Sequence, residues 1–276
     1  MPEEEEVRMT LGDHLDELRR RLLRAVLGVV VGMVVCFFLG EYILQILFLP
    51  LAVATGGRPP NLHYRSLPEP FSTYLRVSLI SGAVLASPYA LYQMWLFIAA
   101  GLYRRERQAV RRYLLPSVVL FILGVAFFLL VVAPLVTAFF LHFAQSSYPT
   151  PPTWGNWLSR YLGRDDLAAA TSQPAAAGTF VQPLLMVGEY ISFVALLSLV
   201  FGLGFQTPLV VLFLGRSGIV SVQRMRRVRR YVFLIICIVS AIVTPADVGS
   251  MIALAVPMYL LYELGLFAAA RKRRED

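Results

Sequence analysis

The sequence predicts an all-α integral membrane protein with six transmembrane helices, and three observations support this fold class. Apolar residue types make up 58% of the 276 residues, which exceeds the roughly 45–50% typical of soluble domains. Long stretches of the chain carry no charge, and basic residues gather at the ends of these stretches. This pattern is typical of membrane-spanning helices, and it leaves no room for a large soluble domain.

The uncharged stretches give the number and lengths of the expected spans. A helix needs about 20 residues to cross a hydrocarbon core of ~30 Å. The first four stretches reach this length with their flanks, whereas the last two hold only about 15–16 uncharged residues each and are expected to be short, with local thinning of the bilayer. The six stretches are 25–40, 77–103, 113–141, 190–215, 231–246 and 248–262.

Basic residues predict how the spans are oriented. Twenty of the 25 lysine and arginine residues fall on one side of the expected six-helix arrangement. The positive-inside rule places this side, with both termini, in the cytoplasm of a cell whose plasma (inner) membrane holds the protein. Because these residues flank spans and do not form one basic domain, the charge of +8 does not indicate nucleic-acid binding. They occupy segments 1–24, 104–112, 216–230 and 271–274.

Three segments outside the spans complete a single membrane domain over residues 1–276. Leucine recurs at positions 11, 15, 18 and 22, so we expect residues 1–22 to form a cytoplasmic amphipathic helix that turns into the first span. Residues 145–188 form a long outer loop rich in proline and alanine, and residues 269–276 form a basic cytoplasmic tail.

Two carboxylates stand inside this basic collar, where their purpose is not obvious. Asp16 and Glu17 precede Arg20 and Arg21 by four residues each, so local i, i+4 ion pairs are one interpretation. The other interpretation is a receptor for a cationic ligand. Carboxylates bind guanidinium groups in a bidentate manner, which selects arginine over lysine.

A further carboxylate, Glu106, lies among five arginines in the loop between the second and third spans. It could simply pair with a neighbouring arginine. If instead Glu106 and Glu17 converge on one cytoplasmic face, the two form a site for a ligand that carries two guanidinium groups.

Acidic residues also occur toward the outer side of the expected bundle. Glu189 opens the fourth span, where a carboxylate at membrane depth is a functional candidate and one at the outer interface is merely solvated. Asp247 lies in the turn "VTPADVGS" (243–250) between the last two spans and is expected to cap the following helix.

Motifs of enzymes and metal sites are not found. The sequence contains no HExxH, GxSxG or GxxxxGK[ST] pattern. Cys36 and Cys237 fall inside apolar stretches, and the three histidines have no spacing that suggests a shared metal. The sequence therefore predicts neither an enzyme nor a metal-binding protein, and no cofactor.

Several separated motifs, in order, resemble the TatC family, the receptor subunits of the twin-arginine protein translocase. The resemblance extends from about residue 10 to residue 268. The outer loop 145–188 looks longer than is usual in that family. The motifs are "HLDELRRRL" (14–22), "FLPL" (48–51), "SPYALYQMWLFIAAGLYRRER" (87–107), "EYISF" (189–193), "TPADV" (244–248) and "PMYLLYELG" (257–265).

This resemblance implies a curved, glove-like bundle that binds twin-arginine signal peptides of folded precursors and nucleates the translocation complex. It further implies TatA-type and TatB-type single-span partners, contact with membrane lipid, self-association within the complex and export driven by the proton-motive force. Glu189 would contact partners within the membrane, and Asp247 is the acid of the outer turn. The signal-peptide site would comprise Glu17, Glu106, Arg19, Phe97, Leu102 and Tyr103.

A small-solute secondary transporter is the alternative function. Glu189 and the prolines inside the spans would suit a binding site at the membrane midplane. Against this alternative, the sequence has no convincing internal repeat, and its acidic residues lie mainly toward the cytoplasmic side.

Overall fold

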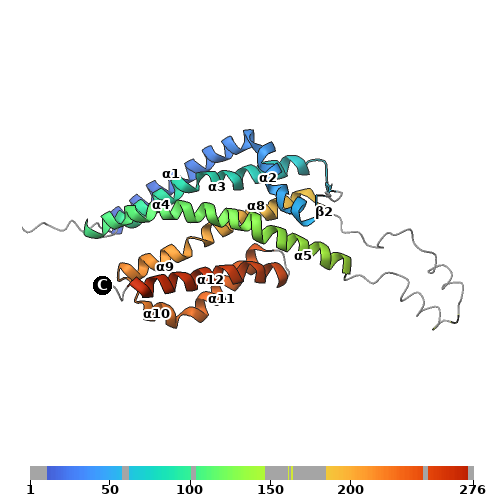
Figure 1. Ribbon diagram of the computed structural model, residues 1–276. Coiled ribbons are helices and arrows are strands. Elements are labelled where there is room, and N and C mark those ends of the chain that lie inside the picture. Colours follow the sequence, from blue (N-terminus) through green and yellow to red (C-terminus); the bar gives the residue numbers. More distant parts are fainter. Residues whose placement is uncertain are drawn as a thin grey trace, which may run out of the picture.

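Helices dominate the computed structural model and run along one common direction (Figure 1). The structure describes residues 11–57, 62–100, 104–146, 161, 163, 185–244 and 248–272. In chain order the elements are α1 Leu11–Phe38, α2 Gly40–Ala54, β1 Leu62–His63, α3 Glu69–Ala100, α4 Arg104–Phe127, the π-helix η1 Phe128–Val132, α5 Ala133–Ser146, β2 Leu185–Met186, α8 Val187–Gly204, α9 Thr207–Arg216, α10 Val222–Arg227, α11 Arg229–Val243 and α12 Val248–Lys272.

The predicted all-α membrane fold is confirmed by the lengths of these helices. Within the described residues, five helical segments are long and apolar enough to cross a membrane. The fifth predicted span corresponds to α11, which has 15 residues and is therefore only about 22 Å long. The five longer segments are Leu15–Phe38, Glu69–Ala99, Arg112–Phe143, Val187–Arg216 and Val248–Arg271.

The last span differs from the prediction of a short helix. α12 has 25 residues and continues past Glu263, where the uncharged stretch was taken to end. The Glu263 carboxylate accepts a hydrogen bond from the Tyr259 hydroxyl at 3.0 Å and pairs with Arg229 of α11 at 2.9 Å. Because its charge is compensated in this way, the acid can lie within the helix without ending it.

The first span differs as well, because it has no turn near residue 22. α1 is one continuous helix from Leu11 to Phe38. The segment between Leu11 and Gly28 contains a glycine only at Gly12 and no proline, and it is rich in leucine and arginine, which are good helix formers. Nothing in the local sequence therefore ends the helix at the expected boundary.

The fourth span is interrupted, and the interruption carries a buried polar network. Between α8 and α9, the Gln206 side chain accepts from the Ser117 hydroxyl of α4 and donates to the Ser117 carbonyl oxygen, both at 2.7 Å. Trp95 of α3 donates its indole N–H to the same hydroxyl at 3.1 Å. Pro208 begins α9, where its missing N–H costs no helical hydrogen bond. The network joins three helices at the break.

The main apolar core joins α2, the π-helix η1, α8 and α12. Phe128, Val194 and Phe201 are completely buried there, and the Phe128 and Phe201 rings lie 5.0 Å apart. In contrast, most of the long apolar side chains on the outer side of α1 are exposed, as expected for a surface that faces lipid.

The bundle has two distinct ends (Figure 1). At one end lie the start of α1, the end of α3, the start of α4, α10 and the end of α12. We call this the basic end, because it carries arginines of α1, α10 and α12. At the opposite end lie α2 and a short parallel pairing in which Leu62 of β1 is in register with Leu185 of β2.

Candidate functional site at the basic end

α1 and α3 pack closely against each other in antiparallel directions, and two glycines permit this approach. A Cβ atom on Gly32 would lie 2.5 Å from the Gly82 carbonyl oxygen. A Cβ atom on Gly82 would lie 2.4 Å from the Met33 nitrogen. Both distances are shorter than real Cβ contacts allow, so the two backbones touch only because neither residue has a side chain.

The contact between Gly32 and Gly82 sets the register of the two helices. Glu17 lies 15 residues before Gly32, and Phe97 lies 15 residues after Gly82. Since both helices rise by about 1.5 Å per residue, Glu17 and Phe97 lie at the same level. Fifteen residues correspond to about four turns, so both also lie on the faces that contain the two glycines. The packing therefore brings Glu17 to the end of α3.

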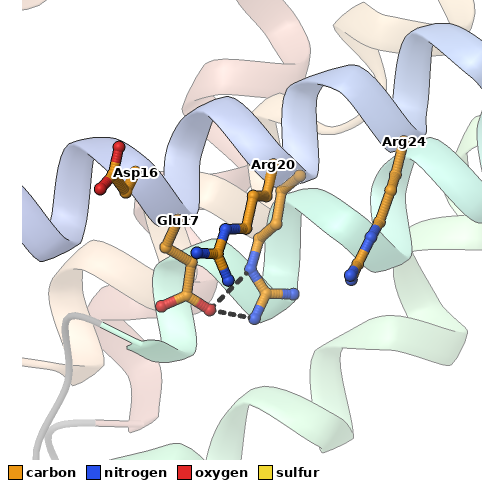
Figure 2. A pocket seen from close by; sticks show the side chains of 5 residues that line it. Asp16, Glu17, Arg20 and Arg24 are labelled. Carbon is orange, nitrogen blue, oxygen red and sulfur yellow. Dashed lines mark hydrogen bonds and ion pairs between the residues drawn. The ribbon is translucent and has the colours of Figure 1, made fainter.

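Glu17 forms an ion pair with Arg21 on this face of α1 (Figure 2). The Arg21 Nε donates to Glu17 Oε1 at 3.0 Å, and Nη2 donates to the same oxygen. The side chains of Glu17 and Arg21 are 22% and 14% exposed, so the pair is partly buried. The structure thus shows the local i, i+4 pairing expected for Glu17.

The pair lines a partly open cavity of about 410 Å³. Arg20 and Arg24 also line it, and Asp16 points to a different side of α1 from Glu17 (Figure 2). Three guanidinium groups and two carboxylates therefore share the cavity, so its local charge is positive by one. Only an anionic group with good geometry can attract a cation there, and Glu17 is the carboxylate on the α3-facing side of the helix.

The other residues predicted for this site have different positions. Phe97 is half-buried in the last turn of α3. Arg19 is exposed, and its spacing of two residues from Glu17 puts it on another face of α1. Glu106 is the third residue of α4, near the end of α3. The position of its side chain, together with Leu102 and Tyr103, lies outside the described residues, so the convergence of Glu106 with Glu17 stays a prediction.

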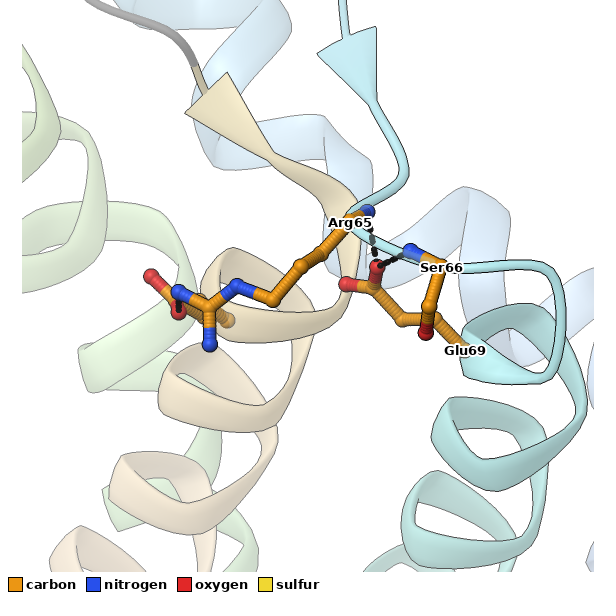
Figure 3. Close-up of polar contacts among 4 residues, drawn as sticks. Arg65, Ser66 and Glu69 are labelled. Atoms are coloured by element: carbon orange, nitrogen blue, oxygen red, sulfur yellow. Dashed lines mark hydrogen bonds and ion pairs between the residues drawn. The ribbon is translucent and has the colours of Figure 1, made fainter.

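Glu189 lies at the opposite end, in the first turn of α8. Its Oε1 is 2.6 Å from Nη2 of Arg65, and the Glu189 side chain is 64% exposed. The main chain of Arg65 is fixed in turn, because its N–H and that of Ser66 both donate to the Glu69 carboxylate (Figure 3). Glu189 thus joins the β1–α3 connection to the start of α8.

Some predicted features cannot be located, and others were missed. Asp247 and most of the 145–188 loop lie outside the described residues. Among the described residues, no three His, Cys, Asp or Glu side chains gather as a possible metal site. Sequence reasoning missed the network around Gln206 and the pair between Arg229 and Glu263, since neither follows a local spacing rule.

Comparisons with known proteins identify the family. The family model described as Sec-independent protein translocase protein (TatC) matches residues 13–257. The chain belongs to the TatC family. The expectation drawn from the sequence motifs is therefore confirmed over nearly the whole chain, in preference to a small-solute transporter.

Individual TatC relatives agree along their full length. The chain is 33% identical over 265 residues to TatC of Desulforapulum autotrophicum, which covers 96% of this chain and 86% of the relative. It is 32% identical to TatC of Aquifex aeolicus, covering 97% and 98% of the two chains. A crystal structure of the twin-arginine translocase receptor TatC superposes with a TM-score of 0.72 at 30% identity, covering 94% of this chain and 98% of that one.

Proposed function

We propose that this TatC-family protein is the receptor subunit of a twin-arginine translocase and binds twin-arginine signal peptides at its basic end. The single observation that carries this proposal is the partly buried Glu17 carboxylate, held against the end of α3 inside a collar of arginines. A lone acid in such surroundings discriminates by geometry and not by bulk charge, because the collar repels cations in general.

The geometry of Glu17 suits a second guanidinium group. Both hydrogen bonds from Arg21 end on Oε1, so Oε2 of the same carboxylate can accept from a ligand. Guanidinium binds carboxylate through two parallel N–H groups, which a lysine ammonium cannot reproduce. This favours a peptide with arginine over the same peptide with lysine.

Glu106 supplies the second acid in this proposal. Its place at the start of α4, close in sequence to the end of α3, supports convergence on the same surface as Glu17. Two acids would match the two consecutive arginines of the signal peptide. Arg19, Phe97, Leu102 and Tyr103 would contact the residues on either side of the arginine pair.

The cellular context follows from the same proposal. The basic end faces the cytoplasm by the positive-inside rule, in the plasma membrane, with both termini on that side. Single-span TatA-type and TatB-type subunits and further copies of this chain are the proposed partners, with Glu189 at one contact. The proton-motive force would supply the energy for export.

A binding measurement with purified protein in lipid nanodiscs tests the proposal. A fluorescent twin-arginine signal peptide should bind the unaltered protein, and its twin-lysine counterpart should bind at least about tenfold more weakly. Glu17→Gln and Glu106→Gln should each weaken binding of the twin-arginine peptide by a similar factor.

Glu41→Gln is the matched control, because it removes one exposed acid from the first turn of α2 at the opposite end. It should leave the affinity unchanged. Equal binding of the two peptides, or unaltered affinity in both Glu17→Gln and Glu106→Gln, would rule the proposed site out.

A further inference from the structure

One buried polar group on α3 has no partner within the described part of the chain. The Gln93 side chain is only 5% exposed, and no hydrogen bond reaches its amide oxygen Oε1. A buried acceptor without a donor is costly, and such groups in a folded protein usually have a second state or a ligand that satisfies them. Gln93 lies in the same α3 segment that packs against α1.

The register of α1 and α3 places Gln93 beside the Glu17–Arg21 pair. Arg21 lies 11 residues before Gly32, and Gln93 lies 11 residues after Gly82. Eleven residues make about three helical turns, so Arg21 and Gln93 share both a level and the facing sides of their helices. An arginine side chain is long and flexible enough to exchange between neighbouring acceptors on two packed helices.

Binding of a peptide arginine at Glu17 creates a need that Gln93 can meet. In the structure, Arg21 gives both of its hydrogen bonds to the Glu17 carboxylate. A ligand guanidinium that binds this carboxylate competes with Arg21 for it. Arg21 is only 14% exposed, so it cannot be released fully into water without moving the surrounding side chains.

We propose that Gln93 is a positioning residue for signal-peptide binding: its buried amide oxygen accepts the Arg21 guanidinium when the peptide arginine takes over Glu17. This inference rests on the proposed function of Glu17. The exchange satisfies the unpaired oxygen of Gln93 and keeps Arg21 hydrogen-bonded. It also turns Glu17 fully toward the ligand, so Gln93 contributes to affinity without touching the peptide.

A double-mutant cycle between positions 21 and 93 tests this exchange. Gln93→Met keeps the length and burial of the side chain but removes the acceptor. It should weaken twin-arginine peptide binding in nanodiscs by about tenfold, the value of one hydrogen bond to a charged group. In an Arg21→Met background the same substitution should have no effect, because no arginine remains to be accepted.

A second variant separates this role from a packing role. Gln93→Glu retains an oxygen acceptor for Arg21, so it should keep the affinity close to that of the unaltered protein. The same loss of affinity for Gln93→Met with and without Arg21 would overturn the proposal. So would unchanged binding by Gln93→Met, or a loss in Gln93→Glu equal to that in Gln93→Met.

The outcomes for Glu17 and for Gln93 are distinguishable. If the unaltered protein fails to distinguish twin-arginine from twin-lysine peptide, the proposed function itself is wrong. If that discrimination is present and Glu17→Gln abolishes it, while positions 21 and 93 show no coupling, only the exchange is wrong. Elution as a single species by size-exclusion chromatography shows that each variant is folded, and Gln93→Glu carries the test if Gln93→Met is not.

Discussion

Replacement of Gly82 by alanine is the sharpest structural perturbation of this site. The new Cβ would lie 2.4 Å from the nitrogen and 2.6 Å from the Cα of Met33. Because backbone atoms cannot rotate away, α1 and α3 must separate by about 1 Å to restore ordinary contact. A gap of this size forfeits a quarter to a half of the dispersion energy of the affected contacts.

Overpacking of this kind costs about 1–3 kcal/mol. For a protein of this size, we expect the midpoint of thermal unfolding to fall by about 5 °C. The same separation moves Glu17 away from Phe97, so the affinity for twin-arginine peptide should fall by about tenfold. Differential scanning fluorimetry in nanodiscs measures the first effect, and peptide titration measures the second.

Gly215→Ala in α9 is the matched control. Its Cβ would lie 3.2 Å from the Ala269 Cβ and 3.4 Å from the Met225 Cε, distances that small side-chain shifts can absorb. It should change neither quantity appreciably. A Gly82→Ala protein with unaltered melting and unaltered affinity would refute the reasoning that close packing of α1 on α3 positions Glu17.

Three further perturbations test other parts of the structure. Gln206→Leu leaves the buried Ser117 hydroxyl without its acceptor and should lower the free energy of unfolding by about 1–3 kcal/mol, measured by thermal unfolding; unchanged stability would contradict the role of this network. Glu263→Leu leaves Arg229 unpaired, and because that pair is partly exposed we expect a loss of only about 1 kcal/mol, against which a loss as large as that in Gln206→Leu would count. Insertion of one helical turn into the 15-residue α11 should impair export of a folded precursor while peptide binding persists, and full export would exclude a role for a thinned bilayer.

Local sequence rules predicted much of the fold. Hydropathy and charge gave the spans and their order, because the bilayer requires long uncharged helices whatever their packing. The i, i+4 spacing of Glu17 and Arg21 also predicted their ion pair. These features depend on neighbours along the chain, so a single sequence is enough to find them.

Features that depend on contacts between distant helices were not predictable in this way. The length of α12 depends on Arg229 of α11, which compensates Glu263. The surroundings of Gln93 depend on the register that Gly32 and Gly82 set, and two glycines 50 residues apart in the sequence do not reveal that they touch. The sequence identified Glu17, but not how it is held.

Site-specific photocrosslinking from α1 to a twin-arginine precursor tests the central claim most directly. A photoreactive residue at Leu18, which is exposed beside Glu17, should crosslink to residues adjoining the arginine pair of the precursor. The same probe at Val30, exposed three turns further along α1, should not. Equal crosslinking from both positions, or undiminished crosslinking from Leu18 to a twin-lysine precursor, would contradict recognition of the arginine pair at Glu17.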